Sequence, residues 1–107
     1  MITRNEISPG QVTLVIDGSL SGANAQEFQS QLEDITSKEY TLVTLDMAQT
    51  TSINSACIGR MLLARKKLKD SSGDIQVKGC SDVIYESLTS LNLDKLINIE
   101  REQSAAT

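Results

Sequence analysis

The chain has no histidine and no tryptophan among its 107 residues, and it has only two cysteines and one proline. The absence of histidine excludes Ser-His-Asp and Cys-His catalysis, and it removes the commonest metal-ligating side chain. Cys57 and Cys80 do not have the spacing of a metal or redox motif. We therefore expect a protein that is not an enzyme and that needs no metal or other cofactor.

Positive charge and long apolar runs are also scarce. The net charge is −4, and the one concentrated basic patch, residues 65–69, is typical of a solvated helix face. Nucleic-acid binding requires a broader basic surface, so we expect no nucleic-acid partner. No apolar run is long enough to span a membrane, and no N-terminal apolar segment suggests secretion. The expected protein is cytoplasmic, has two reduced thiols and has no membrane partner.

The residues that are present fit one small domain. A length of 107 residues is typical of a single domain, here residues 1–107, and a hydrophobic content of 39% suffices for one modest core. The only aromatic residues are Phe28, Tyr40 and Tyr85. The core must therefore be built mainly from Ile, Leu, Val and Met.

Apolar periodicity predicts a hairpin and a helix in the first third of the chain. The pattern of residues 2–6 gives a weak indication of a short edge strand, and Pro9-Gly10 is a turn. Apolar side chains alternate along residues 11–17, which is typical of a strand. The glycines and serines of residues 18–22 interrupt the pattern. A helix with an apolar face is expected from about residue 23 to 37.

A second strand and a second helix follow in the middle of the chain. Residues 40–47 are rich in β-branched and apolar side chains, which is typical of a strand buried on both faces. The helix is expected over residues 55–70, with Leu63 on its outer side. Gly73 is the expected left-handed residue that ends it.

The last third of the chain predicts three short elements and a tail. A strand is expected over residues 75–79 and a helix over residues 81–91 with Ser81 as its N-cap. Four residues would form the apolar stripe of this helix: Val83, Ile84, Leu88 and Leu91. A final strand at residues 97–100 is followed by a polar tail, residues 101–107, expected to be disordered.

This order of elements predicts an α/β fold. Alternating strands and helices favour a mainly parallel sheet, here of four to five strands, with crossover helices packed against it. The first two strands would add an antiparallel hairpin at the N-terminus. Periodicity alone indicates no function.

The most informative segment is residues 51–59, which lies where a strand passes into a helix. The free N–H groups and the positive dipole end at such a helix start favour a negative group. Ser55 sits at this junction. On the residues alone, a structural helix cap is the favoured interpretation, and a phosphorylated serine is compatible with it.

Three segments resemble the STAS domain family, and within it the single-domain bacterial anti-sigma factor antagonists. Residues 18–21, Gly-Ser-Leu-Ser, stand where the family commonly has Gly-Glu-Leu-Asp. Residues 54–59, Asn-Ser-Ala-Cys-Ile-Gly, stand where it has Asp-Ser-Ser/Thr-Gly-Leu-Gly. Residues 91–97 are similar to its C-terminal Gly-Leu-x-x-Leu/Ile-Ile segment. The resemblance covers nearly the whole chain and implies a single STAS-like domain.

The resemblance implies a regulatory cycle centred on Ser55. In such antagonists the corresponding serine is phosphorylated by an ATP-binding serine kinase that is also an anti-sigma factor. The unphosphorylated antagonist binds this kinase and frees the sigma factor, and a PP2C-type phosphatase reverses the modification. A non-switching STAS module, acting as a scaffold in a larger sensing or transport complex, is the alternative.

The chain departs from the family pattern at four positions. Asn54 replaces the acidic residue beside the phosphoacceptor, and Ala56 replaces the second hydroxyl residue. Cys57 replaces the first motif glycine, and Ser21 replaces the acidic residue of the earlier loop. These differences bear on the identity of the partner more than on the fold.

The expected partner-binding surface consists of eight residues: Ser19, Ser21, Asn54, Ser55, Ala56, Cys57, Arg60 and Leu63. The family resemblance places the loop of the first two near the phosphoacceptor, although both are ordinary turn residues. Arg60 and Leu63 are expected on the outer face of the second helix, as scattered surface residues or as a partner-facing patch. For Cys57, a small buried side chain is favoured over a redox sensor.

Overall fold

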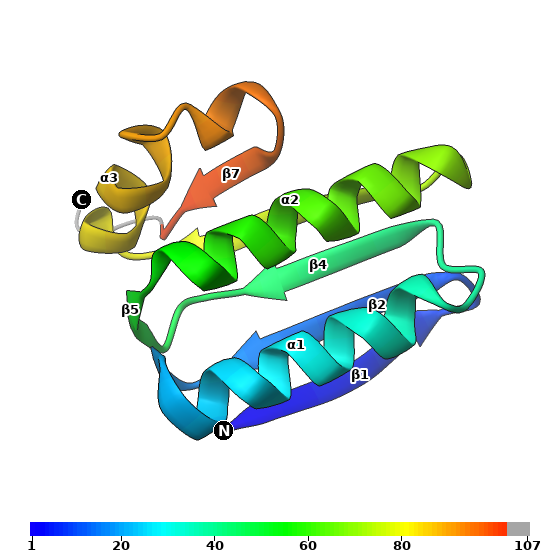
Figure 1. Cartoon of the computed structure of the whole chain (residues 1–107), viewed down its shortest axis with the longest axis horizontal. Coiled ribbons are helices and arrows are strands. Elements are labelled where there is room, and N and C mark those ends of the chain that lie inside the picture. The colour runs from blue at the N-terminus through cyan, green and yellow to red at the C-terminus, as the bar shows by residue number, and fades with distance from the viewer. Residues whose placement is uncertain (103–107) are drawn as a thin grey trace.

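A computed structural model describes residues 1–102, which fold into two sheets with helices packed against them (Figure 1). The elements follow one another in this order: β1 (Ile2–Ser8), β2 (Gln11–Ile16), β3 (Gly18–Leu20), α1 (Gly22–Thr36), β4 (Leu42–Asp46), β5 (Thr50–Ile53), α2 (Ser55–Asp70), β6 (Asp74–Cys80), α3 (Asp82–Thr89), a 3-10 turn (Leu93–Lys95) and β7 (Asn98–Arg101).

The main sheet has five strands in the order β1-β2-β4-β6-β7. β1 and β2 form an antiparallel hairpin, and the remaining neighbours in the sheet are parallel. Gly10 closes the hairpin with a φ of +83°, a conformation that costs glycine little. The predicted α/β fold, with a mainly parallel sheet and an N-terminal hairpin, is therefore confirmed.

Within residues 1–102, helices cover one face of the main sheet and leave the other uncovered. α1 and α2 lie side by side across the covered face, with α3 at one end (Figure 1). β4 accordingly alternates, with Val43 and Leu45 fully buried and Leu42, Thr44 and Asp46 half-buried. The expectation that residues 40–47 are buried on both faces is wrong, because no helix within residues 1–102 covers the second face.

The core lies between this covered face and the helices. It is mainly aliphatic, as predicted, and Phe28 of α1 is its largest fully buried side chain. The predicted stripe of the last helix is half right. Ile84 and Leu88 are fully buried, whereas Val83 and Leu91 are 64% and 56% exposed. Val83 points about 100° away from the buried Ile84 around the helix axis, and Leu91 lies beyond the end of α3.

The small sheet of β3 and β5 was not predicted. It forms where residues 18–22 were expected to be a simple break. Gly18 turns the chain out of β2 with a φ of +96°, and its N–H donates to the Gln49 carbonyl. The buried Thr50 hydroxyl donates to the Ile16 carbonyl at 2.9 Å. These contacts set β3 parallel to β5 at the carboxyl ends of the central strands.

The junction after α2 differs from its prediction. Ser72, with a φ of +64°, takes the left-handed conformation that was expected at Gly73. Gly73 is needed for another reason: a Cβ atom there would lie 2.9 Å from the Tyr40 carbonyl oxygen and 3.3 Å from that of Leu68. This glycine lets the end of α2 pass against the segment that leads into β4.

The last strand reaches further than expected. Arg101 pairs with Cys80 in the sheet, and the Glu102 N–H donates to the Cys80 carbonyl at 2.7 Å. These two residues are therefore not part of the tail predicted from residue 101. The rest of that predicted tail, residues 103–107, lies outside the described residues.

Gly73→Ala should destabilise the protein, because the new methyl group must displace the backbone carbonyl oxygens of Tyr40 and Leu68. We expect a loss of about 1–3 kcal/mol in the free energy of unfolding. Gly59→Ala is the matched control: this exposed glycine of α2 has open space around its Cβ position. It should stabilise the protein by about 0.5–1 kcal/mol. Urea denaturation of both variants measures the difference, and equal effects would contradict the assignment.

Candidate functional site

Asn54 caps α2. Its backbone is extended, with φ −101° and ψ 166°, and its Oδ1 atom accepts a hydrogen bond from the Cys57 N–H at 2.8 Å. This is the arrangement that stabilises a helix N-terminus. Ser55 is the first residue of α2 and not its cap, so the structural interpretation of Ser55 as the cap residue is wrong.

The side chain of Ser55 is free at the surface. The residue is exposed, and no hydrogen bond within residues 1–102 uses its hydroxyl group. The first N–H groups of a helix have no partner inside the helix, and the dipole makes this end partly positive. The hydroxyl therefore combines access from solvent with a local potential that favours a negative substituent.

Cys57 lies under this first turn. Its side chain is 2% exposed, and its Sγ atom lies 3.7 Å from the Leu20 carbonyl oxygen. Burial raises the pKa of the Cys57 thiol, against smaller opposing effects from Asn54 and Arg60. A redox sensor would need exposure and a lowered pKa, and Cys57 has neither. Because the side chain points into the core, only its backbone is available to a partner.

Serine hydroxyl groups gather beside the start of α2. The register of the small sheet pairs Ser19 with Ser52. The Ser19 hydroxyl is hydrogen-bonded to those of both Ser52 and Ser21, the latter at 2.9 Å. Asn24 of α1 holds β3 in place by donating to the Ser19 carbonyl at 2.9 Å. Of the predicted loop residues, Ser19 thus lies on the strand that pairs with the segment leading to Ser55, and Ser21 lies just after this strand, as the N-cap residue of α1. Ser52 is a neighbour that sequence reasoning missed.

Arg60 and Leu63 are exposed on the outer side of α2, as predicted, and Leu63 is 47% exposed. Ala56 is also exposed. These residues border shallow hollows between α1 and α2. The structure therefore places Ser55, Ala56, Arg60 and Leu63 along one helix. Ser19 lies on the neighbouring β3, and Ser21 follows it as the N-cap residue of α1.

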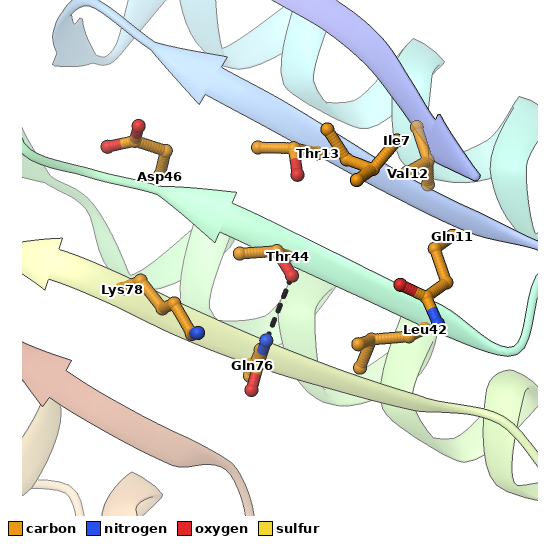
Figure 2. A pocket seen from close by; sticks show the side chains of 9 residues that line it. All are labelled: Ile7, Gln11, Val12, Thr13, Leu42, Thr44, Asp46, Gln76 and Lys78. Carbon is orange, nitrogen blue, oxygen red and sulfur yellow. Dashed lines mark hydrogen bonds between the residues drawn. The ribbon is translucent and has the colours of Figure 1, made fainter.

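A larger hollow, of about 380 Å³, lies on the uncovered face of the main sheet (Figure 2). Thr44 and Gln76 point into it from adjacent strands and are joined by a 3.0 Å hydrogen bond. Asp46 and Lys78 lie further along the same strands (Figure 2). The hollow faces away from the helices, so it is separate from the surface that carries Ser55.

Two further observations concern metals and membranes. Within residues 1–102, no three Cys, Asp or Glu side chains gather into a set that could hold a metal ion. None of the helices in this part of the chain combines the length and apolar character that a membrane crossing requires.

Comparison with solved structures reveals close similarity of fold at low sequence identity. The anti-sigma factor antagonist SpoIIAA in its unphosphorylated form matches with a TM-score of 0.82, 12% identity, and coverage of 98% of this chain and 92% of that chain. SpoIIAA of Bacillus in its phosphorylated form matches with a TM-score of 0.75 at the same identity, covering 98% of this chain and 96% of that chain.

Two other solved structures extend the range of relatives. A putative anti-sigma factor antagonist of Thermotoga maritima has a TM-score of 0.82 and 24% identity, covering 99% of this chain and 91% of that one. A sulfate transporter family protein of Wolinella succinogenes has a TM-score of 0.74 and 14% identity, covering 92% of this chain and 83% of that one. No curated protein sequence matches the chain significantly. The STAS domain model matches residues 3–106, and the chain belongs to the STAS domain family.

Proposed function

We propose that this protein is an anti-sigma factor antagonist that works by partner switching. With Ser55 unmodified, it binds an ATP-binding serine kinase that is also an anti-sigma factor; phosphorylation of Ser55 releases it, and a PP2C-type phosphatase resets it. The cycle operates in the cytoplasm and needs no catalysis by this protein. The observation that carries the proposal is the exposed side chain of Ser55 at the first position of α2, whose hydroxyl forms no hydrogen bond within residues 1–102.

The position of Ser55 lets phosphorylation act on the partner and not on the fold. A phosphate group adds about −1.5 to −2 charges at neutral pH. At this end of α2 the dipole favours such a charge by roughly 0.3–1 kcal/mol. In a partner interface the same dianion would be buried without a counter-charge, which costs several kcal/mol. Because about 2.8 kcal/mol is a hundredfold in Kd, this cost suffices for release.

The similarity to SpoIIAA, which has been solved in both unphosphorylated and phosphorylated forms, supports this proposal. The similarity to a sulfate transporter family protein favours a second candidate, a STAS module that binds its partner without switching. The two candidates differ in one respect that can be measured, namely whether Ser55 is phosphorylated.

The proposed cycle predicts a single phosphorylation at Ser55. Incubation with ATP and each candidate serine kinase encoded in the source genome should yield, for one of them, a mass increase of one phosphate. Ser55→Ala should remove that increase while retaining kinase binding. Intact-mass spectrometry and a binding titration measure the two properties. No mass increase with any candidate kinase would leave the non-switching module as the better interpretation.

The cap assignment predicts that Ser55→Ala is a clean test, because Asn54 and not Ser55 stabilises the start of α2. Asn54→Ala should lower the free energy of unfolding by about 1 kcal/mol through loss of the cap. Ser55→Ala should stay within about 0.5 kcal/mol of the wild type, as surface substitutions usually do. Urea denaturation of the two variants compares them; a larger effect at Ser55 would reverse the assignment.

Asn54→Asp restores the acidic residue of the family pattern and should slow phosphorylation. An aspartate caps a helix as well as asparagine does, so stability should be retained or slightly increased. Its carboxylate would stand beside the incoming phosphate and repel it, whereas the amide of Asn54 does not. Initial rates of phosphate incorporation at matched protein concentrations measure the effect. Equal rates and equal kinase affinities for both forms would show that the charge at this position is irrelevant.

A further inference from the structure

A shallow groove runs along the outer surface between α1 and α2. It consists of two hollows of about 90 Å³ and about 40 Å³, the first at the start of α2 beside Ala56 and the second further along the helix beside Leu63. Gln29 of α1 and Arg60 of α2 line both hollows, so the two are adjacent along the seam between the helices. We call this feature the α1–α2 groove. Small-molecule pockets usually have volumes of about 300–1,000 Å³, so the groove suits side chains of a protein and not a free ligand.

One stripe of α2 forms a wall of the groove. Arg60, Leu63 and Lys67 follow one another at spacings of three and four residues, which places them on the same side of the helix. All three are exposed. Glu33 stands on the α1 side, and no ion pair within residues 1–102 joins it to Arg60 or Lys67.

The charge of α2 is unusual for this protein. The helix carries five of the ten basic residues of a chain whose net charge is −4, namely Arg60, Arg65, Lys66, Lys67 and Lys69. Within the described residues, Lys69 forms an ion pair with Asp74, whereas Arg60, Lys66 and Lys67 form none. Because complementary charge steers association and selects partners, this side of the protein suits an acidic partner surface.

We propose that the α1–α2 groove docks an acidic segment of the kinase, with an apolar side chain placed against Leu63 and carboxylates placed against Arg60 and Lys67. The proposal rests on the proposed function, because it names where and by what chemistry the same partner binds. Charge complementarity and position support it. The groove begins at Ala56, the residue next to the phosphoacceptor, so one partner can cover both. The kinase contact thus extends from the first turn of α2 to Lys67.

Neighbouring lysines provide a matched test. Lys67 lines the groove, whereas Lys66 is exposed, unpaired within residues 1–102 and outside the groove. Both are near the end of α2, so Lys67→Glu and Lys66→Glu change the net charge and the helix-dipole interaction alike. For the kinase that phosphorylates the wild type, Lys67→Glu should weaken binding at least about tenfold, and Lys66→Glu less than about threefold.

A second pair of variants tests the apolar contact. Leu63→Asp places a carboxylate in the groove, whereas Val83→Asp makes a like change at an exposed residue of α3, outside the groove. Only Leu63→Asp should weaken kinase binding by about tenfold or more. Calorimetric titration measures affinity, and thermal unfolding confirms that all four variants fold. The wild-type affinity should also fall as salt is raised.

The outcomes separate this proposal from the one it rests on. Equal losses for Lys67→Glu and Lys66→Glu, with wild-type binding and phosphorylation intact, would overturn the groove as the docking site and leave the proposed function standing. If no kinase binds the wild type, both are overturned. If the wild type dimerises in analytical ultracentrifugation and Lys67→Glu abolishes the dimer, a second copy occupies the groove, and the kinase assignment is wrong.

Discussion

The hydrogen bond from the Cys57 N–H to Asn54 Oδ1 fixes the first turn of α2, and the candidate site depends on it. With Asn54 as the cap, Ser55 becomes the first helical residue and stays exposed at the surface. The same turn directs Cys57 into the core against Leu20. If Ser55 were itself the cap, its oxygen would be engaged with a backbone N–H and less available for phosphorylation. An uncharged asparagine therefore separates the structural role from the proposed chemical role.

One-sided packing of the main sheet supplies the surroundings of that turn. Because α1 and α2 share one face of the sheet, they lie side by side (Figure 1). The α1–α2 groove between them leads away from the start of α2. The small sheet of β3 and β5 extends the surface around Ser55 beyond the start of α2 and brings Ser19 and Ser52 together. Gly18 and the buried Thr50 make this possible by turning the chain at the ends of the central strands. The surface around Ser55 is thus assembled from two separate parts of the sequence, β3 with α1 and β5 with α2.

The sequence predicted the elements that have a strong internal period. The bounds of α2 were predicted as observed, and Ser81 caps α3 as expected, accepting from the Ile84 N–H. The short strands β3 and β5 were missed, because three or four residues are too few to show alternation. The burial of residues 40–47 was predicted wrongly, because Leu42 and Thr44 can lie on a buried face of a strand or on a partly exposed one. Which face is covered depends on where the crossover helices pack, and local pattern does not contain this information.

The same limit applies to the candidate site. Ser55 could be located from the change between strand and helix patterns, and its position at the start of α2 is as expected. The neighbouring Ser52 hydroxyl could not be located in this way, since its contact with Ser19 depends on the register of a sheet that was not predicted. Lys67 was treated as part of a solvated face because a helical wheel does not show the adjoining helix. Its place beside α1 becomes visible only when both helices are positioned on the sheet.

Charge connects the proposed phosphoserine to the groove. Arg60 lies five positions after Ser55, which corresponds to about 7.5 Å along the helix axis. This is within the Debye length of about 8 Å at physiological ionic strength, whereas Lys67, at about 18 Å, is well beyond it. A dianion at Ser55 would therefore weaken the positive potential at the near end of the groove and leave its far end almost unchanged. In the proposed cycle, phosphorylation would act both by burying an unpaired charge at the contact and by reducing the attraction that brings an acidic partner to Arg60.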